Sequence, residues 1–199
     1  MSIADRFRPA LMVRDGLTYR GAMCLHLDAT AALSIAGWVR EEPTRSASAR
    51  VPQPLVGAGG QLVAWVSSFS VLASSDDQVW FLSAENYAGG VGISDEVFPW
   101  DAFRHESLVV ASGSAERAAI NAFWSSHLPV LLSVRDGYEY LALAPDGQVV
   151  RGGEPEFEEV TIVAADFDAL LRGIAAGAST ADPITDALLG TVGTARRGQ

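Results

Sequence analysis

The chain has 199 residues, of which 49% are hydrophobic and 19% charged, a composition typical of a folded domain and not of a disordered segment. This length predicts one domain with a sizeable core over residues 1–177, followed by a C-terminal tail over residues 178–199. The net charge of −10 repels phosphate backbones. The composition therefore argues against nucleic-acid binding and favours either solubility alone or a basic protein partner.

The sequence shows no pattern typical of a membrane or secreted protein. Its longest uncharged stretch, residues 51–75, is interrupted by Pro52 and Pro54, whereas a spanning helix needs about 20 mostly apolar residues. The first residues lack the basic start and apolar run of a secretory signal. The single cysteine, Cys24, cannot form an internal disulfide. We therefore expect a cytoplasmic protein without membrane association and without a cofactor.

In the N-terminal part, the patterns predict strands. Residues 23–28 alternate between apolar and polar side chains, as in a half-buried strand. A second strand is expected over residues 33–41, and one bent strand or two strands over residues 62–72. Between them, residues 43–54 are rich in Ser, Ala, Arg and Pro and predict a long mobile loop.

Strand and helix patterns alternate in the middle of the chain. Residues 79–82 predict a strand and residues 99–103 a single helical turn. Ser114 can cap a helix that continues to about residue 125. The inner face of this helix would carry Ile120, Phe123 and Trp124.

The clearest pattern is a three-stranded antiparallel meander with strands at residues 130–135, 138–143 and 148–151. The dipeptide Asp136-Gly137 accepts the positive φ angles of a two-residue hairpin turn. In the second connection, residues 144–147, proline presets φ and glycine suits the left-handed position. We therefore expect an α+β fold with a mostly antiparallel sheet and flanking helices.

After a short strand at residues 160–163, the sequence predicts an amphipathic helix that docks on the sheet. Asp166 can accept hydrogen bonds from the first turn, and Gly177 suits the end of the helix. Asp168 and Arg172 are spaced for an ion pair on the helix surface. The apolar stripe consists of Phe167, Leu170, Leu171 and Ile174.

Metal and phosphate motifs are weak. Cys24 and His26 would share one face of a strand, but zinc sites take three or four protein ligands, so no metal site is predicted. The glycine-rich run at residues 57–60 follows a proline-rich segment and lacks the Lys-Ser/Thr ending of a phosphate loop. We interpret this run as a linker or turn.

No catalytic set emerges from the sequence either. A nucleophile needs a base and an orienting acid within hydrogen-bond reach, and no Gly-x-Ser-x-Gly motif is present. If the chain is an enzyme that uses the sheet face, the best candidates are His127, Asp136 and Tyr138. A small-ligand site in a pocket between sheet and helices is a further alternative. Both alternatives stay open beside a non-enzymatic binding protein.

The candidate contact residues lie mainly in an acidic loop. Four carboxylates within six residues repel one another, and a cationic partner would relieve that repulsion: Glu154, Glu156, Glu158 and Glu159. The alternative is a solvated loop that only keeps the chain soluble. Trp100 and an exposed aromatic face with Tyr138 and Tyr140 are further candidate contacts, since aromatic side chains often anchor interfaces.

A fixed order of short motifs runs through residues 123–174. In sequence they are Trp124, Leu128-Pro129, Asp136-Gly137, Tyr138-Glu139-Tyr140-Leu141, Asp146-Gly147-Gln148-Val149 and Val163-Ala164-Ala165-Asp166-Phe167. This order resembles the second half of the SUKH superfamily, which includes fungal cell-wall-assembly regulators and bacterial immunity proteins. The resemblance implies a protein-binding module without catalysis, and an immunity protein that neutralises a toxin partner is the specific form we expect.

Overall fold

The computed structural model describes residues 10–43, 51–89 and 99–190, which fold as an α+β protein. The helices are α1 (Ala10–Ile35), the 3-10 helix η2 (Gln53–Leu55), α2 (Gly60–Val66), α3 (Ala84–Ala88), α4 (Ala102–Val110), α5 (Ser114–Trp124), α6 (Phe167–Ala176) and α7 (Pro183–Leu189). The strands are β1 (Val39–Glu41), β2 (Val71–Ala73), β3 (Val79–Phe81), β4 (Leu128–Ser133), β5 (Glu139–Leu143), β6 (Val149–Gly153) and β7 (Thr161–Ala164). The predicted fold class is confirmed.

The strands of the described residues form one sheet with the order β1-β2-β3-β4-β5-β6-β7. This order follows the sequence, so each strand pairs with the one before it, and every pair is antiparallel. The predicted meander is its central part, β4 to β6. Gly147 has a φ of 87° in the second connecting turn, as its turn pattern predicts. The predicted two-residue turn at Asp136-Gly137 is wrong, because β4 ends at Ser133, which pairs with Glu139, and of the dipeptide only Gly137 has a positive φ, 128°.

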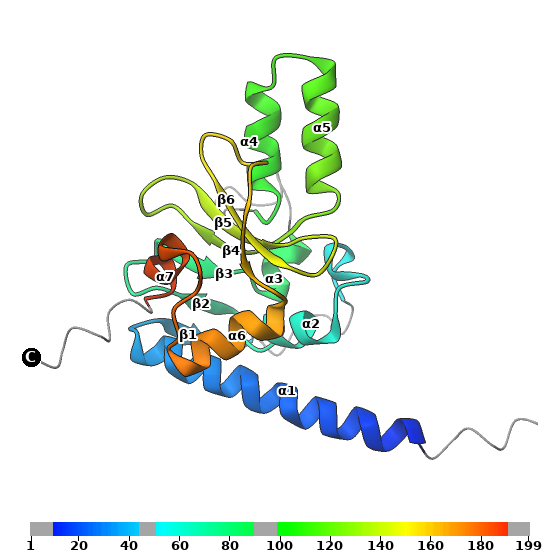
Figure 1. The fold of residues 1–199 in the computed structure, drawn as a ribbon, viewed down its shortest axis with the longest axis vertical. Helices are drawn as coiled ribbons and strands as arrows, with labels where there is room; N and C mark the ends of the chain where they lie inside the picture. The colour runs from blue at the N-terminus through cyan, green and yellow to red at the C-terminus, as the bar shows by residue number, and fades with distance from the viewer. Residues whose placement is uncertain (1–9, 44–50, 90–98, 191–199) are drawn as a thin grey trace, which may run out of the picture.

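Different helices cover the two faces of the sheet (Figure 1). On one face, Tyr140 packs against Phe103 of α4 and Trp124 of α5, with ring centroids 5.5 Å and 4.9 Å away. On the other face, the ring centroids of Phe81 and of Trp65 in α2 are 5.3 Å apart. The helix α6 packs against both α2 and α1. Successive strand residues point to opposite faces, so the middle of the sheet is buried on both sides.

The last predicted helix is also present. Asp166 caps α6 by accepting a hydrogen bond from the Ala169 N–H at 2.6 Å, and Gly177 ends it with a left-handed φ of 59°. All four residues of the predicted stripe, Phe167, Leu170, Leu171 and Ile174, are buried. The predicted surface pair is wrong in one partner, because Arg172 forms its ion pair with Asp166 at 3.6 Å and not with Asp168.

The predicted N-terminal strands are mostly helices. Residues 23–35 belong to α1, and the strand over residues 33–41 is reduced to β1. The decisive pattern is the helical spacing of the buried His26, Ala29 and Leu33. Residues 60–66 are likewise the helix α2, with Leu62, Trp65 and Val66 buried. The glycine run at residues 57–60 therefore opens a short helix and not a strand.

Three further expectations change. Of the helical turn predicted at residues 99–103, only residues 102 and 103 are helical, as the start of the longer α4. The helix α5 begins at Ser114 with Gly113 in the cap position, so Ser114 is no cap. Part of the predicted tail at residues 178–199 is the helix α7, whose Leu188 and Leu189 are buried in the core, and residues 191–199 lie outside the described part of the chain. Of the predicted loop at residues 43–54, residues 44–50 lie outside the described part of the chain.

Candidate functional site

The acidic loop is folded onto the sheet through Phe157. The Phe157 side chain is buried and its ring lies 5.1 Å from that of Phe103. Its backbone carbonyl accepts a hydrogen bond from the hydroxyl of Tyr140, whose pKa is raised by burial. The phenol of Tyr140 lies against Gly152 in the paired strand, where any Cβ would overlap it. A tyrosine and the glycine opposite it thus position the loop.

Two of the glutamates make specific contacts. Glu158 accepts a hydrogen bond at 2.9 Å from the indole Nε1 of the buried Trp124. Glu154 accepts a weak one at 3.4 Å from the Tyr138 N–H, and its own N–H donates to the Tyr138 carbonyl at 2.9 Å. The hairpin turn at residues 136–138 and the loop at residues 154–159 therefore lie side by side.

This arrangement brings a turn that carries one exposed carboxylate and a partly exposed tyrosine beside a loop that carries three more exposed carboxylates. We call it the acidic surface and define it by Asp136, Tyr138, Glu154, Glu156 and Glu159, all of which are exposed. Tyr138 is 38% exposed, and its ring contacts Phe103 edge-on at 6.1 Å, which holds it in place.

The neighbouring arginine does not neutralise this surface. Arg135 directs its guanidinium away, to both carboxylate oxygens of Asp76 at 2.9 Å and 3.1 Å. Exposed carboxylates on two adjoining segments, together with an aromatic ring, are suited to bind a cationic side chain, by charge and by cation–π attraction.

The other predicted contact residues are placed differently. Tyr140 is fully buried, so the expectation of an exposed aromatic face that includes it is wrong. The helices α4 and α5 cover that face, and the local sequence of the strand contains no sign of this cover. Trp100 is half-buried beside Tyr87, whose hydroxyl donates to the carbonyl of Pro129 near the start of β4.

The candidate catalytic residues do not converge. His127 precedes Leu128, which pairs with Leu143 at one end of the β4–β5 hairpin, whereas Asp136 and Tyr138 lie beyond the opposite end. The strand between these ends spans about 17 Å, which is far longer than a hydrogen bond between side chains can bridge. The imidazole of His127 instead stacks on the Phe123 ring at 3.8 Å.

The predicted Cys24 and His26 pair is also separated. Both residues lie on α1, where a two-residue step points side chains in nearly opposite directions: Cys24 is exposed and His26 is buried. Across residues 10–43, 51–89 and 99–190, no three His, Cys, Asp or Glu side chains are grouped to hold a metal ion. In the same part of the chain, no helix is long and apolar enough to cross a membrane.

The structure also contains a polar network that the sequence did not reveal. Arg151 pairs with Asp182 at 2.6 Å and with Glu139 at 3.3 Å, and Asp182 also accepts from Thr185. Burial raises the pKa of Glu139, although Arg151 opposes the shift. Burial also acts to raise the pKa of Asp182, but hydrogen bonds from Thr185 and Arg151 outweigh it and leave this pKa lowered. The network attaches the start of α7 to the sheet.

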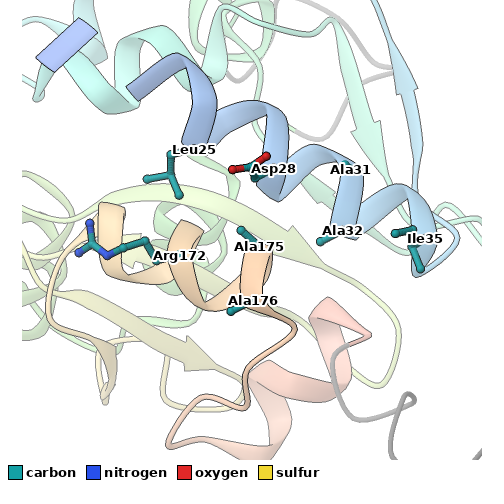
Figure 2. A pocket seen from close by; sticks show the side chains of 8 residues that line it. All are labelled: Leu25, Asp28, Ala31, Ala32, Ile35, Arg172, Ala175 and Ala176. Carbon is teal, nitrogen blue, oxygen red and sulfur yellow. The ribbon is translucent and has the colours of Figure 1, made fainter. Parts of the chain in front are cut away.

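A groove of about 490 Å³ lies between α1 and α6 and is lined mostly by alanine and other apolar side chains (Figure 2). It lies outside the sheet and does not include His127.

Comparisons of the chain with protein-family models, with curated proteins and with solved structures find no match. The acidic surface, which combines charge with a fixed aromatic ring, is therefore the candidate site on geometry alone.

Proposed function

We propose that the protein is a non-enzymatic binding module and that its acidic surface binds a basic protein partner. The observation that carries the proposal is the joining of the 136–138 turn to the 154–159 loop, since the two adjoining segments carry four exposed carboxylates and the partly exposed Tyr138. A loop that served only solubility would need neither the buried Phe157 nor the hydrogen bonds that fix its backbone.

The physical chemistry favours a cationic protein over a small ion. The carboxylates are exposed and spread over two segments, so they act over a surface and not within a cavity. Such a surface speeds the encounter with a cationic partner, by roughly 10- to 1000-fold in favourable cases, and this gain falls steeply with salt. Tyr138 adds an exposed aromatic side chain, of the kind that often anchors interfaces.

The first partner to look for is a toxin. Residues 123–174 resemble the SUKH superfamily, in which many bacterial members neutralise toxins, and this stretch includes the whole acidic surface. An immunity protein would bind a basic toxin domain and block it without any chemistry of its own. A gene for a large secreted toxin next to the gene for this chain would support this more specific form of the proposal.

The proposal is tested with two baits of equal charge. The surface variant carries Glu154→Gln, Glu156→Gln and Glu159→Gln. The control variant carries Glu41→Gln, Glu85→Gln and Asp146→Asn, which are exposed acids on other parts of the molecule. Partners are captured from native cells in parallel with the wild type, identified by mass spectrometry and then purified for stopped-flow measurement of the association rate.

We expect the surface variant to associate about tenfold more slowly than wild type at low salt, with a weaker dependence on salt. The control should keep most of the wild-type rate, because its charges lie elsewhere. Unfolding midpoints of all three proteins should agree closely, since the substituted side chains are exposed. Equal association rates for the surface variant and wild type at low salt would contradict the proposal.

A further inference from the structure

The imidazole of His26 is buried where α1 packs against α2 and α6. His26 is only 7% exposed, and its ring contacts that of Trp65 in α2 edge-on, with the centroids 5.5 Å apart. The Trp65 ring in turn contacts that of Phe167 at the start of α6, with the centroids 6.3 Å apart. Figure 1 shows α1 alongside α6, the helix against which it packs. His26 therefore belongs to the contact that holds α1 on the other two helices.

This contact contains buried polar atoms without a hydrogen-bond partner among the described residues. They are Nε2 of His26, Nε1 of Trp65 and Oε1 of Gln61. Gln61 and Trp65 are four residues apart in α2, so their side chains lie on the same side of that helix. A buried charge costs far more than a buried neutral nitrogen, because the charge also loses its solvation by water. The contact therefore accepts a neutral imidazole and disfavours a protonated one.

The charged groups around His26 do not compensate for this burial. The helix α2 has no charged residue, and Asp28 of α1 is exposed. The helix α6 carries Asp168 and Arg172, of which Asp168 acts on His26. Burial is the largest influence on the pKa of His26 and lowers it below the ordinary value of 6.5, although Asp168 and Gln61 both oppose the shift.

We propose that His26 is a pH-sensitive switch, in which protonation of the imidazole weakens the docking of α1 on α2 and α6. The proton is bound when α1 separates locally and His26 becomes exposed to water. Histidine is the side chain whose charge ordinarily changes between about pH 5 and 8, so mild acidification is the signal. The switch is separate from the proposed partner site, because α1 and the acidic surface lie on opposite sides of the sheet (Figure 1).

The direction of the effect follows from proton linkage. The separated state has the ordinary His pKa of 6.5 and the docked state a lower one, so the separated state binds more protons between these two values. The docking of α1 is therefore most stable above about pH 6.5 and weakens as the pH falls below that value. Between about pH 7.5 and 5.5, protonation of the exposed His26 raises the equilibrium constant for separation by at most about tenfold.

Hydrogen exchange at these two pH values tests the switch, once the rates are corrected for the intrinsic pH dependence of exchange. The amides of residues 26–33 should lose about three- to tenfold of their protection at the lower pH. They should also exchange faster than the amides of β4 at both pH values, because α1 separates without global unfolding. His26→Phe keeps an aromatic ring that binds no proton, so it should abolish the pH response of α1. His105→Gln is the matched control, because His105 is exposed on α4, and it should respond as wild type does.

A second measurement leaves His26 in place and so does not depend on the folding of His26→Phe. In an NMR titration of the wild type, the His26 imidazole should show a pKa below 6.5. Asp168→Asn removes the carboxylate that favours the charged ring, so it should lower the pKa of His26 further and enlarge the acid response of α1. Asp28→Asn removes the same charge from an exposed position on α1 and should leave the pKa of His26 nearly unchanged.

Three results would overturn the switch. The first is a His26 pKa at or above 6.5, and the second is an equal acid response of α1 in His26→Phe and in wild type. The third is equal protection of α1 and β4 at the lower pH, since acid would then act on the whole fold and not on α1. The proposed function would survive each of these results, because the association rate with a basic partner is measured separately on the acidic surface.

Discussion

Tyr140→Phe separates the hydrogen bond that positions the acidic loop from the packing around it. The substitution removes only the hydroxyl that donates to the Phe157 carbonyl and keeps the ring against Phe103 and Trp124. The carbonyl is then left without this donor in a buried position, which costs about 1–3 kcal/mol. In a chain of 199 residues, each kcal/mol corresponds to a shift of about 2–4 °C in the unfolding midpoint.

We therefore expect Tyr140→Phe to lower the midpoint by roughly 2–12 °C in calorimetry, with a matching loss of free energy of unfolding in urea. Glu156→Gln is the control in the same loop, because Glu156 is exposed, and it should stay within about 0.5 kcal/mol of wild type. If Tyr140→Phe also stays within about 0.5 kcal/mol, the Tyr140 hydroxyl does not hold the loop and the structural basis of the acidic surface is wrong.

Four further substitutions test other parts of the structure. Leu170→Ala or Leu171→Ala should each lower the free energy of unfolding by about 2–5 kcal/mol in urea denaturation, because both side chains of α6 are buried in the core. A loss under about 0.5 kcal/mol for both would refute the docking of α6. The hydrogen bond from Arg135 is the largest factor that lowers the pKa of Asp76, to about 2, so its stabilising effect is present above the ordinary pKa of 3.8 and is lost as pH falls through about 2. In an NMR titration, Arg135→Gln should raise the Asp76 pKa towards 3.8, and an unchanged value would exclude this ion pair. Asp182→Ala removes the cap of α7 and should cost at least 0.5–2 kcal/mol, and no change in stability would show that α7 is not held in this way.

The C-terminal half could be predicted from the sequence because its signals are local. Gly137 and Gly147 mark turns whose conformations few other residues adopt. Asp166 and Gly177 mark the two ends of α6 with side-chain and backbone chemistry that acts within a few residues. Such signals do not depend on what packs nearby, and the structure confirms them.

The N-terminal half could not be predicted in the same way. In α1 the apolar residues lie on all sides of the helix, so Met23, Leu25 and Leu27 appear to alternate although they are helical. The buried face is set by packing against α6, which follows more than 130 residues later in the chain.

The C-terminal helix α7 could not be predicted either. Asp182 and Asp186 are buried and hydrogen-bonded, whereas acidic residues in a sequence usually indicate an exposed segment.

The candidate site was predicted only in part. The exposed Glu154, Glu156 and Glu159 follow from the charge pattern alone. The burial of Tyr140 depends on α4 and α5, which lie in a different part of the sequence. The contact between the hairpin turn and the loop depends on the pairing of β5 with β6, which places Glu139 opposite Gly153. Tertiary contacts of this kind have no local sequence pattern.

The most direct test of the proposed function is a footprint of the purified partner on this chain by hydrogen–deuterium exchange. Exchange is compared with and without a saturating amount of the partner, at a salt concentration low enough to keep the complex intact. We predict slower exchange of the backbone amides at residues 136–138 and 154–159, where the acidic surface would be covered. Slower exchange confined to segments outside these two, with both unchanged, would contradict the proposal that the acidic surface binds the partner.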